Sequence, residues 1–191
     1  MTPESLLADR APPPRATVAV AARAADTTLR IEPLSRNHNR KSFDCGDEQV
    51  NRFLREQALQ DHERNLSRTT VLIDEADPAR IIGYHTLVMA HVKQEQNPAD
   101  RPRIKRGIPV ILLGQLGVDK EFQQRHFGEM LLMDAQARVD EISRRTGVRA
   151  MMLDARNERL ARWYERHDFT RFRGQFRMFK SIAAIRALKL I

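Results

Sequence analysis

The chain has 191 residues, enough for one well-buried domain and too few for two full-sized ones. With 41% apolar and 30% charged residues the composition is that of a globular protein, and a single cysteine, Cys45, excludes an intramolecular disulfide. The net charge of +8 fits a polyanionic partner and a basic surface kept for solubility equally well. Only 6% of the residues are aromatic, which disfavours a stacking platform for single-stranded nucleic acid.

Residues 1–28 contain apolar stretches, but three consecutive prolines, Arg15 and Arg23 interrupt them. This order does not suit a secretory signal, and no apolar run reaches the roughly 20 residues that span a bilayer. We therefore expect a flexible N-terminal extension over residues 1–28, a folded domain over 29–191, a cytoplasmic location and no membrane contact.

The first half of the domain predicts one helix among short strands. Residues 29–33 read as a short strand, and Asp47 is placed to cap a helix with one apolar face formed by Val50, Phe53, Leu54 and Ala58. Residues 69–73 and 81–92 read as two strands joined by a turn over 74–78. The polar, basic segment 93–107 follows as a loop.

The second half alternates strands and helices. Residues 108–118 are almost continuously apolar, as in a strand buried on both faces. After a turn at 119–125, apolar residues recur at helical spacing until Gly147, where a left-handed cap is expected. A strand over 148–155, a short helix over 157–167 and a last strand or hairpin complete a mixed α/β domain.

The segment 112–135 combines a buried strand, a polar loop and the start of a helix. Unpaired backbone N–H groups and the helix dipole favour a pyrophosphate there. Arg125 adds a formal charge, and Gly128 allows a phosphate oxygen to come close to the backbone. Taken alone, the arrangement fits a phosphate site and an ordinary connection equally well.

The same segment resembles the coenzyme-binding stretch of the GNAT acetyltransferase superfamily, whose loop reads Q/R-x-x-G-x-G/A. Gln123 and Gly128 match its ends, whereas His126 replaces the middle glycine. His126 could add a donor to the phosphates, or it could narrow the loop and weaken binding. We expect it to be tolerated, because with a negative φ its N–H matters more than its side chain. The resemblance implies acetyl-CoA as cosubstrate, with Leu116 and Val118 offering backbone groups to its acetyl and pantetheine arm. The implied coenzyme contacts are Leu116, Gly117, Val118, Gln123, Gln124, Arg125, His126, Phe127, Gly128 and Asn157.

Residues 152–169 are similar to the GNAT stretch D-A-x-N/D-x-x-A-x-x-F-Y-E-x-x-G-F. There Asn157 corresponds to a coenzyme contact and Tyr164 to the general acid that protonates the CoA thiolate. A core aromatic on an amphipathic helix is the alternative for Tyr164, but its place after Trp163 favours the catalytic role. Asp168 occupies a position where the family has glycine.

No separate general base is evident. An α-amino group, with a pKa of about 7.7–8.0, is partly neutral near pH 7, whereas a lysine side chain at about 10.4 would need more help. The chemistry therefore favours an α-amino acceptor.

Upstream blocks extend the resemblance to the GNAT toxins of bacterial toxin–antitoxin pairs, across residues 29–182. These toxins share an F-x-C-G-x-x-x-L-x-x-F-L start, a G-Y-Y-T-L strand and a P-V-x-L-L-G-R-L-A-V-D strand. The resemblance implies a central, mostly antiparallel mixed sheet that is splayed at the coenzyme site and flanked by helices. It also implies acetylation of aminoacyl-tRNA that blocks translation, a ribbon-helix-helix antitoxin and a homodimer. Gln115, Gly117 and His85 depart from the pattern.

Two other functions remain open. One is a GNAT enzyme acting on a protein N-terminus or a small-molecule amine, although a basic enzyme suits a polyamine poorly. The other is a non-catalytic GNAT-fold module that binds nucleic acid or a partner, against which Tyr164, Gln123 and Gly128 argue.

Basic residues supply candidate contacts to tRNA phosphates, with a solvated basic loop as the alternative. The candidates are Lys93, Arg101, Arg103, Lys105 and Arg106 in the loop, with Arg64 and Arg68 before it. The six histidines show no paired metal-ligand spacing, so no metal is expected.

Overall fold

A computed structural model describes residues 28–92 and 107–187 of the chain. The predicted extension, residues 1–28, lies outside the described residues except for Thr28. The predicted basic loop also lies outside them except for Gly107, and its residues Lys93, Arg101, Arg103, Lys105 and Arg106 are not described.

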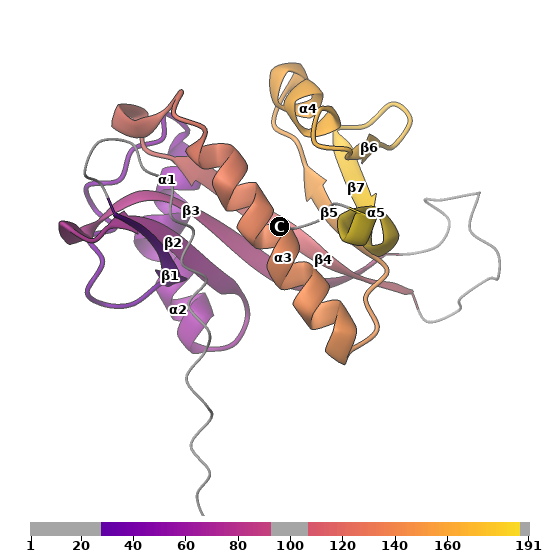
Figure 1. The fold of residues 1–191 in the computed structure, drawn as a ribbon, viewed down its shortest axis with the longest axis horizontal. Helices are drawn as coiled ribbons and strands as arrows, with labels where there is room; N and C mark the ends of the chain where they lie inside the picture. Colours follow the sequence, from indigo (N-terminus) through magenta and orange to yellow (C-terminus); the bar gives the residue numbers. More distant parts are fainter. Residues whose placement is uncertain (1–27, 93–106, 188–191) are drawn as a thin grey trace, which may run out of the picture.

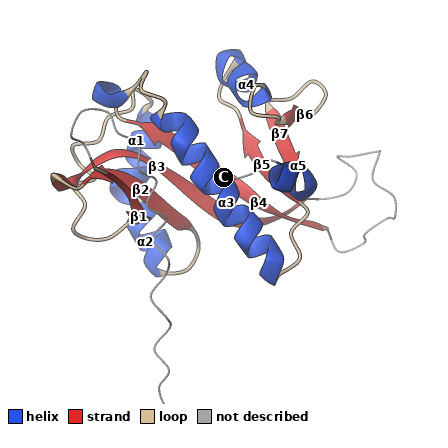
Figure 2. Cartoon of the chain, in the orientation of Figure 1, coloured by secondary structure: helices blue, strands red, loops and turns tan. Residues whose placement is uncertain are grey.

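The described part of the chain forms a seven-stranded sheet in the order β1-β2-β3-β4-β5-β7-β6 (Figures 1 and 2). Its strands are β1 (Leu29–Pro33), β2 (Arg68–Asp74), β3 (Asp77–Val92), β4 (Ile108–Val118), β5 (Ala150–Asp154), β6 (Thr170–Arg171) and β7 (Arg177–Ser181). Only β4 and β5 run parallel, and the other neighbours are antiparallel. The predicted mixed, mostly antiparallel α/β fold is confirmed.

Helices cover both faces of this sheet. They are α1 (Glu48–Glu56), α2 (Ala58–Glu63), α3 (Phe127–Arg145), α4 (Glu158–Glu165) and α5 (Ile182–Ala187), with a short 3-10 turn η2 (Lys120–Phe122). Long α3 crosses one face, where its Leu131 packs with Leu72 and Ile82 (Figure 1). On the opposite face, Val50 of α1 packs with Tyr84. On β2, Leu72 belongs to the cluster under α3, whereas its neighbours Val71 and Ile73 belong to the cluster under α1, as the pleat of a strand requires.

Helix α1 begins where the sequence predicts. The Asp47 side chain accepts hydrogen bonds from the backbone N–H groups of Gln49 and Val50 and so caps the helix. The predicted single helix through Ala58 is wrong, because α1 ends at Glu56 and Gln57 separates it from α2.

The end of α3 also differs from the prediction. The chain leaves the helix at Thr146 in an extended conformation, with φ −148° and ψ 161°, and Gly147 does not have a positive φ. The left-handed cap is wrong because the chain turns directly from the helix toward β5. Arg144 and Arg145 in the last turn complement the negative end of the helix dipole.

The sheet splays between β4 and β5. These strands pair over only three positions, from Val110–Ala150 to Leu112–Met152. The pairing of β3 with β4 skips one residue at Gly114, which is a β-bulge on β4. Because a bulge bends its strand and increases the local twist, β4 leaves β5 just beyond this point. Strand β5 continues to Asp154, paired with β7 on its other side.

Candidate active site

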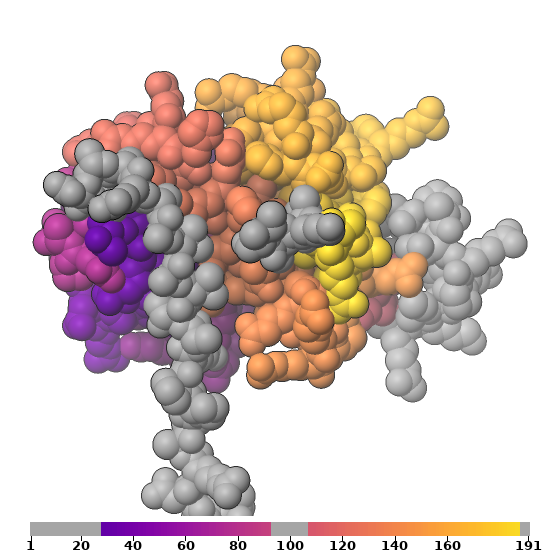
Figure 3. All heavy atoms as spheres, viewed as in Figure 1, coloured from indigo at the N-terminus to yellow at the C-terminus, as the bar shows by residue number. Residues whose placement is uncertain are grey.

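A cleft of about 1120 Å³ lies where β4 and β5 separate. Its wall comes from the end of β4, the loop before α3, the first turns of α3 and α4, and the turn that leads into α1. The segments around the start of α3 and around α4 lie next to each other at the upper edge of the molecule (Figure 3). The volume slightly exceeds the usual range for small-molecule sites, about 300–1,000 Å³.

Every predicted coenzyme contact except Arg125 lines this cleft: Leu116, Gly117, Val118, Gln123, Gln124, His126, Phe127, Gly128 and Asn157. Arg125 is exposed, with its guanidinium over the Phe122 ring at 5.7 Å from the ring centroid. The structure thus brings together residues from three separate parts of the sequence.

Gln123 ties the loop to its surroundings. Its Nε2 donates to the carbonyl oxygens of Cys45 and Val118, each at 3.0 Å. The Val118 carbonyl, expected to face the pantetheine arm, therefore accepts a hydrogen bond from within the protein. Gln123 holds the loop against the turn before α1.

The expected negative φ of His126 is wrong. His126 has φ 61° and Gln124 has φ 65°, so two residues of the loop adopt the left-handed conformation. The middle glycine of the family pattern has an obvious physical role at such a position, because only glycine adopts it without steric cost. The His126 side chain is 82% exposed, and its Nδ1 lies 3.1 Å from Glu129 Oε2.

The free energy of unfolding is expected to be about 1 kcal/mol higher for the His126→Gly variant than for the His126→Ala variant, because alanine keeps the strain of the left-handed conformation. Both variants lack the imidazole, so their comparison separates backbone from side chain. Chemical denaturation measures the stabilities, and calorimetry measures acetyl-CoA binding. Equal stabilities of the two variants would contradict the strained conformation.

Gly128 lies in the first turn of α3, where backbone N–H groups have no partner within the helix. A Cβ at this position would lie 3.9 Å from the side chains of Trp163 and Val118, an ordinary contact distance. The glycine is thus in the wall of the cleft with the positive end of the α3 dipole behind it.

Asn157 lies at the start of α4, in the wall of the cleft opposite the N-terminus of α3. Its Oδ1 accepts a hydrogen bond of 2.9 Å from the Leu160 N–H and caps α4. The residue therefore fixes the beginning of the helix that carries Tyr164, in addition to lining the cleft.

Tyr164 is buried in the wall of the cleft. Its ring packs edge-on against Trp163 and Phe169, with centroids 4.8 and 5.6 Å away. Within the described residues, no hydrogen bond engages its hydroxyl, and burial raises the pKa of this phenol above its usual value. The side chain therefore remains protonated at physiological pH, as a proton donor must.

A buried lysine supports the turn after α4. Lys180 on β7, with 1% of its side chain exposed, donates to the His167 carbonyl at 2.8 Å and lies 3.4 Å from Asp168 Oδ2. Asp168 has φ 62°, so it adopts the left-handed conformation at a position where the family has glycine. Nothing in the sequence pattern pointed to Lys180.

The other departures from the family pattern affect the walls of the cleft and the sheet behind it. His85 is fully buried on β3, and its Nε2 lies 2.7 Å from Asp134 Oδ2 on α3. Burial lowers the pKa of His85 and favours the neutral ring. A Cβ on Gly117 would lie 3.0 Å from Val50 Cγ1, so the glycine allows α1 to pack closely on β4. Gln115 lines the cleft.

Two candidate tRNA contacts lie in the described residues. Arg64 is exposed at the end of α2. Arg68 is exposed at the start of β2, where it donates to the His62 carbonyl at 2.8 Å and to the Asn65 side chain. Neither residue lines the cleft.

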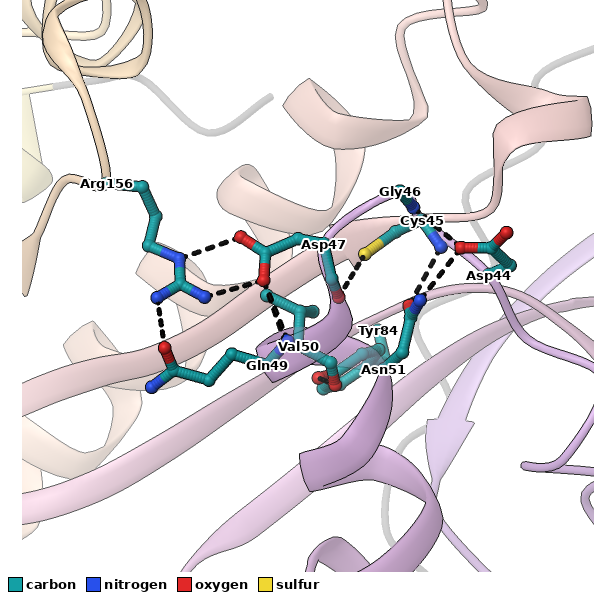
Figure 4. Close-up of polar contacts among 9 residues, drawn as sticks. All are labelled: Asp44, Cys45, Gly46, Asp47, Gln49, Val50, Asn51, Tyr84 and Arg156. Carbon is teal, nitrogen blue, oxygen red and sulfur yellow. Dashed lines mark hydrogen bonds and ion pairs between the residues drawn. The ribbon is translucent and has the colours of Figure 1, made fainter.

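Sequence reasoning missed one ion pair at the cleft. The Arg156 guanidinium donates to both carboxylate oxygens of Asp47, at 2.8 and 2.6 Å, and to Gln49 Oε1 at 2.5 Å (Figure 4). Asp47 signalled only a helix cap, and 109 residues separate it from Arg156. No local pattern could have joined the two.

The described residues contain no group of three His, Cys, Asp or Glu side chains suited to a metal ion, and the predicted absence of a metal stays a prediction. No helix in the described ranges is long and apolar enough to cross a membrane.

No family model matches the chain. A curated relative from Mycobacterium tuberculosis, named tRNA-acetylating toxin, is 31% identical over 132 residues, covering 67% of this chain and 76% of the relative. The chain belongs to the GNAT toxin family.

Solved GNAT toxin structures have the same fold. A tyrosine-to-phenylalanine mutant of KacT superimposes with a TM-score of 0.78 at 26% identity, over 84% of this chain and 98% of KacT. A mutant of AtaT, bound to acetyl-CoA and to the C-terminus of its antitoxin AtaR, superimposes with a TM-score of 0.72 at 25% identity, over 84% and 97%. The family and enzyme class expected from the sequence are confirmed.

Proposed function

We propose that this GNAT toxin transfers the acetyl group of acetyl-CoA to the α-amino group of aminoacyl-tRNA and thereby blocks translation. The observation that carries the proposal is the position of the Tyr164 hydroxyl, without a hydrogen-bond partner among the described residues, in the wall of a cleft between splayed strands. The name of the mycobacterial relative and the acetyl-CoA bound to AtaT support it. So does the net charge of +8, which favours a polyanionic acceptor.

Each part of the cleft is proposed to have a separate role in binding or catalysis. The N-terminus of α3 with Gly128 is proposed to receive the pyrophosphate of acetyl-CoA, because its free N–H groups and helix dipole favour an anion. The free edge of β4 beyond Leu112 is proposed to face the pantetheine arm. Tyr164 is proposed to give its proton to the sulfur that leaves when the amine attacks the thioester.

The decisive experiment incubates the purified chain with radiolabelled acetyl-CoA and three acceptors: aminoacyl-tRNA, the same tRNA uncharged, and a peptide with a free N-terminus. We expect label only with aminoacyl-tRNA, released by mild base as N-acetyl amino acid. Label on the peptide alone would support the alternative acetyltransferase function. Absence of both acetyl-CoA binding and transfer would support a non-catalytic module.

We further propose that a ribbon-helix-helix antitoxin neutralises the protein, that it forms a homodimer, and that it acts in the cytoplasm through a single domain over residues 29–191. The antitoxin bound to AtaT supports the existence of a protein partner. The tRNA phosphates are proposed to meet Lys93, Arg103, Lys105, Arg106, Arg64 and Arg68.

A further inference from the structure

The Asp47–Arg156 ion pair spans the cleft from one wall to the other. Arg156 belongs to the loop between β5 and α4, whereas Asp47 and Gln49 belong to the start of α1 (Figure 4). All three residues line the cleft. The pair therefore connects the two walls that the splaying of the sheet separates.

The position of the pair corresponds to the side from which an acceptor would approach. Helix α3, whose N-terminus is the proposed coenzyme end, covers one face of the sheet, and α1 covers the other. A thioester placed between β4 and β5 would leave the α1 face open to the attacking amine. Asp47 and Arg156 line the cleft where α1 begins.

The chemistry of the pair suits an acceptor that carries phosphate. A guanidinium offers a planar fork of donors that matches a phosphate, whereas the Asp47 carboxylate would repel one. The side chains of Arg156 and Asp47 are 36% and 39% exposed, so water can reach the pair. A bidentate pair is at the stronger end of solvent-accessible ion pairs, but a phosphate accepts the same parallel hydrogen bonds from the guanidinium and can therefore replace the carboxylate.

We propose that Arg156 binds a phosphate of the 3′-terminal nucleotides of the acceptor, and that Asp47 competes with this phosphate for the guanidinium in the free enzyme. This inference rests on the proposed function and assigns a specificity-determining residue to it. A small amine without phosphate would not break the pair, whereas the acceptor end of a tRNA would exchange its phosphate for the Asp47 carboxylate.

The two halves of the pair are then expected to have opposite effects. Arg156→Gln raises the KM for aminoacyl-tRNA about tenfold, because a charge-assisted hydrogen bond is lost. Asp47→Asn lowers this KM about threefold, because the competitor for Arg156 is removed. Asparagine is as good a helix cap as aspartate, so α1 keeps its start. The kcat at saturating acetyl-CoA changes little in either variant.

Salt adds a second readout. In Arg156→Gln the slope of log KM against log salt concentration becomes shallower by about 0.7, the value for one phosphate contact on a single strand. In Asp47→Asn it does not become shallower. KM is measured by steady-state kinetics between low and physiological salt, and thermal unfolding of each variant is recorded alongside.

Asp140→Asn and Arg186→Gln are the matched controls. Arg186 Nε lies 2.7 Å from Asp140 Oδ1 at the other end of α3, outside the cleft lining. Asp140→Asn changes the net charge as Asp47→Asn does, and its KM is expected to match that of the unmodified enzyme.

The inference is overturned if the Asp47 and Arg156 variants shift KM in the same direction, or if Asp140→Asn lowers KM as much as Asp47→Asn. A rise of KM in Asp47→Asn would instead assign the carboxylate to the amino group of the acceptor. If Arg156→Gln does not fold, the sign of the Asp47→Asn effect still decides. No transfer by the unmodified enzyme to aminoacyl-tRNA would refute the proposed function itself.

Discussion

Tyr164→Phe is expected to lower kcat about 10²- to 10⁴-fold while acetyl-CoA binding stays within a factor of a few. Phenylalanine keeps the edge-on packing against Trp163 and Phe169 but has no proton to give to the leaving thiolate. Single-turnover acetylation of aminoacyl-tRNA measures the rate, and calorimetry measures binding. Induction of the unmodified chain in a bacterial host should arrest growth, and induction of the variant should not.

Tyr84→Phe is the matched control, because Tyr84 and Tyr164 are the two tyrosines of the chain. The Tyr84 hydroxyl donates to the Val50 carbonyl at 2.8 Å, and Tyr84 itself is not among the residues that line the cleft. Its loss should lower the free energy of unfolding by about 1 kcal/mol and leave kcat unchanged. A Tyr164→Phe enzyme with full kcat would show that Tyr164 is only a core aromatic.

Gly128→Asp is expected to weaken acetyl-CoA binding about tenfold or more, because it places a negative charge beside the proposed pyrophosphate position. Gly128→Ala provides the steric control, since a Cβ there makes only 3.9 Å contacts and the φ of Gly128 is not positive. Calorimetry with acetyl-CoA at low and high salt separates charge from shape. The deficit of the aspartate variant should shrink as salt increases.

An alanine variant that binds as weakly as the aspartate variant would assign the loss to shape instead of charge. Equal binding by all three proteins would place the pyrophosphate elsewhere. The second result would leave the cleft and Tyr164 unaffected, because neither depends on the N-terminus of α3.

The sequence predicted those elements that are determined mainly by interactions between residues close to one another in the chain. Strand β4 has the bounds predicted from its apolar run, 108–118. The predicted burial on both faces is incomplete, because Gly114 is exposed and the residues beyond it are mostly half-buried where the cleft opens. Asp47 and Asn157 cap the predicted helices with their side chains. The resemblance placed Asn157 and Tyr164 in one motif, and both line one cleft.

Backbone conformation was harder to predict. The sequence letters of His126 and Gln124 carry little information about φ, and their left-handed geometry follows from how the loop is fixed at both ends. The same holds at Gly147, where glycine normally favours a left-handed cap but the path to β5 requires an extended chain.

Long-range polar contacts were the hardest. Arg156 meets Asp47 across 109 residues, and Lys180 reaches the turn at Asp168 from a different strand. The local sequence explains Asp47 as a helix cap, Arg156 as a charged loop residue and Lys180 as a strand residue, without indicating their partners. Their partners are determined by the order of strands in the sheet, which no single segment encodes.

Only three residue pairs join β4 to β5. The sheet therefore consists of two parts, β1–β4 and β5–β7, with little backbone pairing between them. A ligand in the cleft would touch both parts and act as a non-covalent cross-link between them. Ligand binding and unfolding are then thermodynamically linked, and the apparent stability increases with the logarithm of ligand concentration above its Kd. The cellular concentration of coenzyme would in this way determine the free energy required to separate the two half-sheets.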